Sequence, residues 1–514
     1  MLNSEKNIIE NGNFKNLVQN NLKKVDVHWQ QQGLEMQDNK VVDRKHWEEA
    51  GQGHVFNWYD ELSSEDRLIF EEDLRQIDVD EINTIYKRLI DEKVNQKINL
   101  SYHGFENVKT IDSLTTEDRD RWETIGHKLI SEGRVALLLL AGGQATRLGT
   151  TFPKGQYDIG LPSKKSLFQL QAERVLKLEQ MTKSKMGVTE MKPIQWYIMT
   201  SKATHDATIE FFEKHNYFGL LKDSFFFFQQ TMIPCLTPEG KIINETSSKI
   251  SLSPNGNGGL YHSLLVSGGL SDMRSKGIEY ISQYCVDNVL IKMADPLFLG
   301  YMHDQQADCA AKVVAKVDPE EPVGVMALRD GKPCVLEYSE IDRDSKYLRD
   351  EATGRLTFNY AHICINNFSF EFLDRIASSE LSRELPYHVA TKKIPYANEQ
   401  GIRTTPDAVN GWKMEMFIFD VFPYSKHMVC LEVKRDEEFS PLKNNAGMAI
   451  PKDSPETCLR DICQLHRTYI ERAGGKLDFS ESNIIEISPL ISYSGESLET
   501  IVSEKLILLP KEIK

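Results

Sequence analysis

The sequence predicts an α/β protein whose core is one mostly parallel, doubly wound sheet. The run from Val135 to Leu140 is continuously apolar and ends in Ala141-Gly142-Gly143, which is typical of a parallel strand buried on both faces. Further apolar runs alternate with helix-length segments, the order expected when helices cover both faces of a sheet. The expected strands are 196–199, 225–228, 284–286 and 312–317, and the intervening helices include 166–179 and 204–215.

Helices are expected on the amino-terminal side of this sheet. Apolar residues recur at helical spacing between residues 47 and 90, and Ser63 stands three residues before Asp66, as in a helix cap. Another helix-like stretch covers residues 116–130. These segments indicate a small helical domain before the sheet.

The chain is expected to divide into four parts. Its first residues are rich in Asn, Gln, Lys and Glu and show weak periodicity. After about residue 437, a Pro- and Asn-rich stretch precedes a helix at 457–473 and short β-like segments. The parts are a loosely ordered extension (1–42), a helical amino-terminal domain (43–130), the α/β domain (131–437) and a smaller α+β carboxyl-terminal lobe (438–514).

The composition is that of an acidic globular protein. The 514 residues include 61 Lys+Arg and 76 Asp+Glu, a net charge of −15, and 40% are hydrophobic, which excludes a wholly disordered chain. This balance repels a phosphate backbone, so no nucleic-acid partner is expected. With no signal peptide and no apolar run of membrane-spanning length, we expect a cytoplasmic protein without a membrane partner. Eight scattered cysteines without a C-x-x-C pattern indicate reduced thiols.

The segment after the first predicted strand carries the strongest sequence signal. Glycines there let backbone N–H groups approach an anion, and Arg147 and Lys154 bring two cations to the same place. This pattern indicates a polyphosphate site; the alternative is a tight turn with two solvated cations. Neither G-x-x-x-x-G-K-[ST] nor G-x-G-x-x-G is present, because Ala145 interrupts the glycines, and a dehydrogenase is therefore disfavoured.

Several further motifs between residues 50 and 500 occur together with this loop. They are 160–163, 165–174, 227–230, 255–261, 284–288, 322–324, 337–340, 413–415, 417–420, 439–443 and 487–493. In this combination the chain resembles the eukaryotic UDP-N-acetylhexosamine pyrophosphorylases, which are UTP:sugar-1-phosphate uridylyltransferases. The resemblance implies a central Rossmann-like, GT-A-like nucleotidyltransferase domain with a mostly parallel mixed sheet. It leaves open whether the chain forms a homodimer.

The resemblance also assigns residues to UTP. Those along the nucleotide would be Leu140, Ala141, Gly142 and Gly143, with Gln230 and Gly256 at the uracil and Asp287 at the metal. A side-chain amide such as that of Gln230 can both donate to and accept from a base edge. Arg147 and Lys154 would hold the β- and γ-phosphates and stabilise the leaving pyrophosphate.

Asp287 is the expected ligand of Mg²⁺ or Mn²⁺. It ends an apolar strand, from where a carboxylate reaches a metal that bridges phosphate oxygens. Without the resemblance it would be read as a turn residue. One protein carboxylate is compatible with Mg²⁺, because this ion usually keeps several waters and binds substrate phosphates.

A second set of residues would bind N-acetylhexosamine-1-phosphate. It comprises Asn257, Gly324, Glu337, Tyr338, His362, Phe417 and Phe419, with Lys413 and Lys443 as catalytic cations. We expect residues 413, 415, 417 and 419 to share one face of a strand, so that Asp420 points away and is no metal ligand. Lys443 would reach the sugar-side phosphate, which implies closure of the carboxyl-terminal lobe.

The implied reaction is in-line attack of a sugar-1-phosphate oxygen on the α-phosphorus of UTP, with release of pyrophosphate. A phosphate monoester has a second pKa near 6, so the nucleophile is anionic at pH 7 and needs no general base. The product would be UDP-N-acetylglucosamine, or the N-acetylgalactosamine equivalent. Catalysis would consist of positioning and charge neutralisation by four cations, Arg147, Lys154, Lys413 and Lys443, and the metal.

Three positions depart from the family pattern. Ala145 replaces a glycine, which we expect to be tolerated if φ stays negative. His362 replaces an asparagine expected at the sugar, which opens the choice among GlcNAc-, GalNAc- and unacetylated sugar phosphates. His262 stands where related chains often carry arginine.

Other readings remain open. The nearest is the same chemistry with Glc-1-phosphate or Gal-1-phosphate. A glycosyltransferase would want a D-x-D ligand pair, and the D-x-D sequences at 342–344 and 78–80 follow no buried strand. A non-catalytic nucleotide-sugar binder is disfavoured by the retention of Arg147, Lys154 and Lys413.

Overall fold

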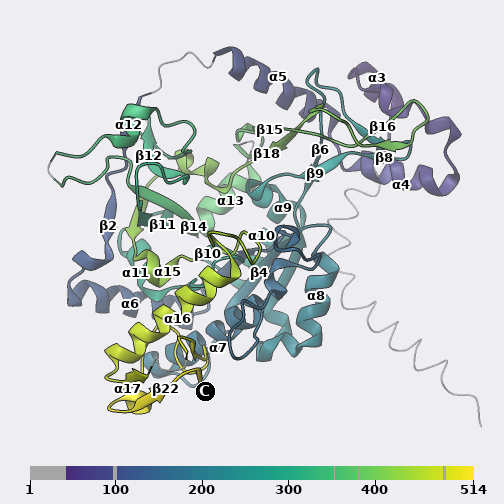
Figure 1. Ribbon diagram of the computed structural model, residues 1–514. Helices are drawn as coiled ribbons and strands as arrows, with labels where there is room; N and C mark the ends of the chain where they lie inside the picture. Colours follow the sequence, from purple (N-terminus) through teal and green to yellow (C-terminus); the bar gives the residue numbers. More distant parts are fainter. Residues whose placement is uncertain (1–41, 96–100, 352, 380, 479–481) are drawn as a thin grey trace, which may run out of the picture.

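The computed structural model describes residues 42–95, 101–351, 353–379, 381–478 and 482–514. The extension expected at 1–42 lies outside these ranges apart from its last residue. Within them, an 11-stranded mixed sheet forms the centre (Figure 1). Its path runs through β2 (Val108–Thr110), β19 (Met428–Glu432), β11 (Cys309–Ala315), β14 (Tyr360–Ser369), β10 (Tyr280–Cys285), β3 (Val135–Leu140), β4 (Gln195–Thr200) and β5 (Phe225–Gln229).

The pairing of these strands is mostly parallel. β2, β19 and β11 are parallel to one another, as are β10, β3, β4 and β5. β14 lies between the two groups and is antiparallel to both neighbours. Three more strands extend the sheet beside β14: β1 (Tyr102–Gly104), β12 (Val325–Arg329) and β13 (Lys332–Leu336). The α/β class and the mostly parallel mixed sheet are therefore confirmed.

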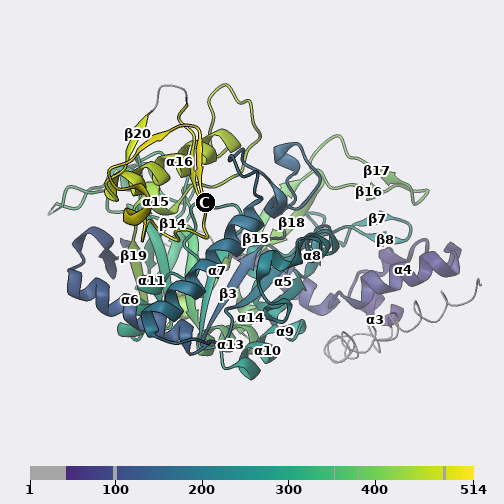
Figure 2. The same cartoon turned by 90° about the horizontal axis from the view of Figure 1, so that it is seen from below.

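The two faces of the sheet are covered by two different helical layers. Leu137 and Leu139 of β3 belong to one apolar core and Ala136 and Leu138 to another, because successive residues of a strand face opposite sides. The first core holds α6 (Thr116–Ser131), α7 (Leu167–Met186), α8 (His205–Lys214) and α11 (Pro296–Asp304), and the second α9 (Leu260–Val266), α10 (Gly269–Lys276) and α13 (Phe370–Ser378). Figure 2 shows α7 lying across the sheet. No helix in the described ranges is both long and apolar enough to cross a membrane.

The amino-terminal helices form a separate core. They are α3 (Arg44–Glu49), α4 (Ser64–Arg75) and α5 (Val79–Asn95), packed against β6 (Met232–Pro234), β8 (Lys249–Ile250), β9 (Leu252–Pro254) and β18 (Gly411–Glu415). As predicted, the Ser63 side chain accepts a hydrogen bond from the Asp66 N–H and begins α4. The predicted domain end at residue 130 needs correction, because β1, β2 and α6 pair with or pack on the central sheet. We place the boundary before β1.

Short elements connect these layers. A two-stranded ladder joins β15 (His388–Lys392) to β18, and others join β7 (Asn244–Thr246) to β8 and β16 (Tyr396–Ala397) to β17 (Arg403–Thr404). Two short helices are α12 (Arg343–Tyr347) and α14 (Leu381–Glu384). The β15–β18 ladder lies between the amino-terminal helices and the central sheet (Figure 1).

The carboxyl-terminal segment packs against the loop that follows β3. Its helix α16 (Pro455–Arg472), predicted at 457–473, buries Ile462 and Leu465 in one core with Ala145 and Leu148 of that loop. The remaining elements are α15 (Arg435–Glu438), α17 (Glu499–Val502) and two parallel pairs, β20 (Lys476–Asp478) with β22 (Leu506–Leu508) and β21 (Ile485–Ile487) with β23 (Lys511–Ile513). The lobe therefore supports the loop that the sequence singles out.

Candidate active site

The loop after β3 folds back on itself. It passes through two 3-10 turns, η4 (Thr146–Leu148) and η5 (Lys154–Gln156), and the Lys154 N–H donates to the Gly143 carbonyl at 3.2 Å. A Cβ added to Gly142 would lie 3.3 Å from Oε1 of Gln230, whereas one added to Gly143 would meet nothing within 4 Å. The loop is thus closely packed toward Gln230 and open at Gly143, where a phosphate can approach the backbone.

The two cations of this loop have different surroundings. Arg147 is exposed, and its guanidinium makes no hydrogen bond or ion pair within the residues that the structure describes. Lys154 is half-buried, and its Nζ donates to the Leu442 carbonyl at 3.1 Å. Ala145 keeps a φ of −82°, so its methyl group requires no left-handed backbone.

Asp287 lies at the same edge of the sheet as this loop. β10 and β3 are parallel neighbours with Cys285 beside Leu140, so the segments that follow them emerge together. Oδ2 of Asp287 is 3.8 Å from Nζ of Lys154. Burial raises the pKa of Asp287, and the charges of Lys154 and Lys443 oppose that rise. The structure therefore brings three predicted residues into one electrostatic cluster.

A short antiparallel contact holds the carboxyl-terminal lobe against the segment of Asp287 and Asn288. Asn288 is paired with Pro441, and the Leu442 N–H donates to the Asp287 carbonyl at 2.9 Å. The side chain of Asn288 donates to the Glu438 carbonyl at 2.7 Å and accepts from the Ser440 N–H at 3.0 Å. These bonds fix the segment that carries Lys443 beside Asp287.

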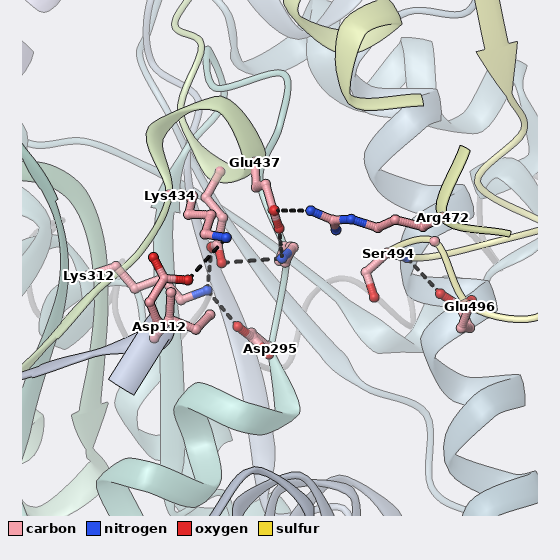
Figure 3. Close-up of polar contacts among 12 residues, drawn as sticks. Asp112, Asp295, Lys312, Lys434, Glu437, Arg472, Ser494 and Glu496 are labelled. Carbon is pink, nitrogen blue, oxygen red and sulfur yellow. Dashed lines mark hydrogen bonds and ion pairs between the residues drawn. The ribbon is translucent and has the colours of Figure 1, made fainter. Parts of the chain in front are cut away.

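A buried network of charged side chains holds the start of the Lys443 segment in place (Figure 3). Lys312 of β11 has no exposed side-chain surface and donates to Oδ2 of Asp295 at 2.6 Å and to Oε2 of Glu438 at 2.5 Å. Arg472, at the end of α16, pairs with Glu437 at 2.9 Å. Since Glu438 ends α15, both the sheet and the lobe hold the start of the Lys443 segment.

The predicted uracil residues contact each other. The Gln230 N–H donates to the Thr200 carbonyl at 2.7 Å, which continues the β4–β5 ladder, and the Gln230 amide donates to the Gly256 carbonyl. Gly256 has a φ of +70°, and a Cβ there would lie 2.2 Å from the Met416 carbonyl oxygen. Both the backbone conformation and the close approach therefore require glycine.

Aromatic rings line the side of the site predicted for the sugar. Phe417 and Phe419 lie with ring centroids 5.2 Å apart, and His362 meets Phe419 edge-on at 5.8 Å. The His362 N–H donates to the Gly324 carbonyl at 2.9 Å. Asn257 has a structural task, because its Oδ1 accepts from the Ile418 N–H at 2.9 Å and so holds the backbone beside the rings.

The polar groups beside these rings influence each other's protonation. Burial raises the pKa of Glu337, as does the charge of Glu340, while His362 and His388 oppose the rise. For His362, burial lowers the pKa, but Cys364, Asn366 and Glu337 outweigh it, so that the net direction is upward. His362 Nε2 lies 2.9 Å from Asn366 Oδ1. A carboxylate and two imidazoles thus share one polar environment.

The strand expected to join Lys413 to Phe419 ends early. β18 ends at Glu415 and a 3-10 helix, Ile418–Tyr424, follows, because the Asp420 carboxylate caps the Phe417 N–H at 2.7 Å. The prediction of one shared strand face is therefore wrong beyond residue 415. Lys413 acts electrostatically on the thiol of Cys235, and no described contact joins it to Lys154 or Asp287.

Tyr338 and the two D-x-D sequences lie outside the groups of residues described above. Tyr338 is 46% exposed, and no described contact joins it to the aromatic rings. Asp342 of the first D-x-D sequence caps α12, and the second, 78–80, begins α5, so both serve helix starts. Within the described ranges no group of three or more His, Cys, Asp or Glu residues could hold a metal ion. A metal here would need ligands from the substrate.

Several residues of the site carried no clear sequence signal. His388, Lys312 and Glu438 come from three segments far apart in the chain. Their proximity to the predicted residues depends on strand order, which residue spacing does not encode. The sequence indicated Asn288 as the neighbour of Asp287, but its hydrogen bonds to Glu438 and Ser440 could not be predicted from the sequence.

The fold and this site define a class: an α/β protein with an anion-binding loop and a carboxylate at the carboxyl edge of a mostly parallel sheet. The family described as UTP--glucose-1-phosphate uridylyltransferase matches residues 79–501. The chain belongs to this family.

Its similarity to particular proteins is close. The Dictyostelium discoideum protein named "Probable UDP-N-acetylglucosamine pyrophosphorylase" is 63% identical over 91% of this chain and 97% of its own length. UDP-N-acetylglucosamine diphosphorylase 2 of Arabidopsis thaliana is 42% identical over 90% and 92%. The crystal structure of the Trypanosoma brucei uridine diphosphate N-acetylglucosamine pyrophosphorylase, in complex with an inhibitor, matches with a TM-score of 0.78 at 30% identity over 90% of this chain and 95% of that one.

Proposed function

We propose that the chain transfers the uridylyl group of UTP to N-acetylglucosamine-1-phosphate, forming UDP-N-acetylglucosamine and pyrophosphate. The observation that carries the proposal is the cluster of Lys154, Asp287 and Lys443, where the glycine loop meets the carboxyl-terminal lobe. The names of the relatives favour an acetylated sugar over Glc-1-phosphate or Gal-1-phosphate.

The proposed reaction depends on positioning and charge. The sugar phosphate is anionic at pH 7 because its second pKa is near 6, so it attacks the α-phosphorus without a general base. Lys154 and exposed Arg147 neutralise the departing pyrophosphate, and Lys443 neutralises the incoming sugar phosphate. Gln230 and Gly256 orient the uracil so that the reacting groups are aligned.

Asp287 is the residue that would hold a divalent cation. A single buried carboxylate whose pKa is raised by burial gains from a nearby positive charge, and Mg²⁺ commonly takes one protein carboxylate besides phosphates and waters. The donor set therefore fits Mg²⁺ or Mn²⁺ that binds together with UTP. Such an ion would supply charge neutralisation to the phosphates.

The aromatic side is proposed to select the sugar. Phe417 and Phe419 offer an apolar surface to the acetamide methyl group, while Glu337 and His362 offer partners to hydroxyl groups. Because His362 is held by Asn366, it presents one fixed ring orientation. GalNAc-1-phosphate is a second substrate candidate, since it differs only at one hydroxyl.

The test is pyrophosphate release from UTP and Mg²⁺ with each of four sugar phosphates: GlcNAc-, GalNAc-, Glc- and Gal-1-phosphate. The proposal expects release with the acetylated sugars. Release only with the unacetylated sugars would instead support the alternative, in which the substrate is Glc-1-phosphate or Gal-1-phosphate. If UTP binds but no sugar phosphate gives release, the proposal is wrong and the protein is a non-catalytic nucleotide-sugar binder.

A further inference from the structure

The aromatic side of the site contains a fourth ring that the residue motifs did not indicate. His388, the first residue of β15, stacks on Phe417 with centroids 4.1 Å apart and planes inclined by 19°. Together with the contacts of Phe417, Phe419 and His362 this makes a continuous row of four rings. We call these four residues the ring wall.

The position of His388 in this wall is fixed by one carboxylate. Its Nε2 lies 3.2 Å from each oxygen of Asp420, whose side chain is only 7% exposed. Oδ2 of Asp420 also accepts from the Phe417 N–H at 2.7 Å. Asp420 therefore fixes the imidazole and the backbone of the ring beneath it at the same time. A displacement of Asp420 would free both.

His388 also faces the carboxylate that the proposed function assigns to the sugar. Electrostatic interactions join His388 to Glu337 and Glu340, which follow β13, and to Asp420. Across the β15–β18 ladder its register partner is Glu415. The charged groups that act on it are thus carboxylates, which favour the imidazolium form, while Lys413, two residues before Glu415 on the same face of β18, is a cation in the same ladder.

Its exposure distinguishes His388 from a core histidine. The side chain is 40% exposed, and Nδ1 has no hydrogen-bond partner among the residues that the structure describes. Buried polar groups are normally satisfied internally, whereas this nitrogen remains available to a ligand or to water. A half-exposed ring that is fixed on one nitrogen and free on the other is suited to a substrate site.

We propose that His388 is a positioning residue for the sugar-1-phosphate: held by Asp420, it keeps the Phe417 ring and the Glu337 carboxylate in the arrangement that binds the sugar. This inference rests on the proposed function and adds a residue to its sugar side. It assigns no proton transfer to His388. Within the described residues no hydrogen bond or ring contact joins His388 itself to Gln230 or Gly256 on the nucleotide side.

The protonation of His388 gives the proposal a specific pH dependence. Burial lowers the pKa of His388, but the hydrogen bond and charge of Asp420, with Glu340 and Glu337, outweigh it and raise the pKa above its usual value. As the pH rises through that pKa, the positive charge is lost and Glu337 is no longer compensated. The KM for the sugar phosphate should then rise, while the KM for UTP should not. Above pH 7 the sugar phosphate is already dianionic, so its own titration contributes little.

The test compares two variants of the full chain with the wild type between pH 7 and 9. His388→Gln keeps an N–H for Asp420 but has neither ring nor charge, and we expect about a tenfold higher KM for GlcNAc-1-phosphate, roughly 1.4 kcal/mol. Its KM for UTP should stay within about twofold, and its KM for the sugar should no longer depend on pH. His388→Phe restores stacking without charge and should recover part of the affinity but none of the pH dependence.

His427→Gln is the matched control, because His427 is an exposed histidine that contacts Asn107 outside the site. Its kinetic constants should equal those of the wild type. If His388→Gln raises both KM values together or lowers only thermal stability, the residue is merely structural and the inference is wrong. If the wild type releases no pyrophosphate with any sugar phosphate, the proposed function fails first, an outcome distinct from an active wild type that His388→Gln leaves unchanged.

Discussion

Nζ of Lys154 lies 3.8 Å from Oδ2 of Asp287 and 3.1 Å from the carbonyl oxygen of Leu442. One ammonium group thereby connects the glycine loop, the segment after β10 and the carboxyl-terminal lobe. Phosphates that enter between these segments meet Lys154 at their common point. Under the proposed function, this contact would couple the placement of the lobe to the placement of the nucleotide.

Lys154→Ala should lower the rate more than it weakens sugar binding. Removal of one preorganised charge at a developing oxyanion commonly costs about 10²–10³ in kcat. We expect a loss of about 100-fold in kcat, with the KM for the sugar phosphate within about threefold, measured by pyrophosphate release. Lys164→Ala is the control, because the Lys164 side chain is 70% exposed. A large KM change without a kcat change would contradict the assigned role.

Gly256→Ala should damage the uracil side specifically. The added Cβ would lie 2.2 Å from the Met416 carbonyl oxygen, in addition to the strain of a φ of +70°. Gly277→Ala is a matched control with a φ of +74° and nothing within 4 Å of its Cβ. Both should lose about 1 kcal/mol from left-handed backbone strain, but only the first should raise the KM for UTP. Equal effects of the two on that KM would refute the close-approach argument.

Lys312→Met should be strongly destabilising, because Asp295 loses its direct ion pair and buried Glu438 keeps only the longer contact with Lys292 at 3.4 Å. Loss of one member of a buried ion pair costs about 3–5 kcal/mol in the free energy of unfolding. Denaturant unfolding should show this loss. Lys222→Met removes a pair with Glu213 in which the lysine is 66% exposed, and it should cost less than about 1 kcal/mol. Similar costs for the two variants would count against the network as an anchor.

Stability should fall on the acid side because of two buried histidines, His466 and His127, whose pKa values burial lowers to about 4. The Nδ1 of His466 accepts from the Ile487 N–H at 3.2 Å. Between pH 6.5 and 4 the unfolded chain binds a proton at each histidine that the folded chain does not, so the free energy of unfolding decreases as pH falls through that window, by about 3 kcal/mol at most for each.

The variant His466→Gln should reduce this pH dependence but not abolish it, because His127 remains, as thermal unfolding measured between pH 4 and 7 would show. His103→Gln, which changes an exposed histidine, should leave it as in the wild type. An unchanged slope in His466→Gln would exclude His466 as one of its sources.

Local patterns predicted most elements well, and their failures have physical causes. The apolar run 135–140 and the Ser63 cap correspond to β3 and to the start of α4, since burial on both faces and capping are properties of adjacent residues. The strand through Lys413 was extended too far because a capping bond from the Phe417 N–H to the Asp420 carboxylate, three residues on, begins a 3-10 helix there. The boundary at 130 was misplaced because β2 pairs with β19, more than 300 residues further along the chain.

The sequence by itself determined which functional groups are present: glycines after a buried strand, cations beside them, and an acidic residue at a strand end. It also determined a family resemblance, which the comparisons confirm. Only the tertiary structure decided which groups meet. Strand order brings Asp287 next to Lys154, and a buried lysine and an asparagine hold the Lys443 segment there. The packing of β15 on β18 places His388 on Phe417. Spacing along a chain fixes which side chains share one element, whereas contacts between elements depend on how their apolar faces pack together.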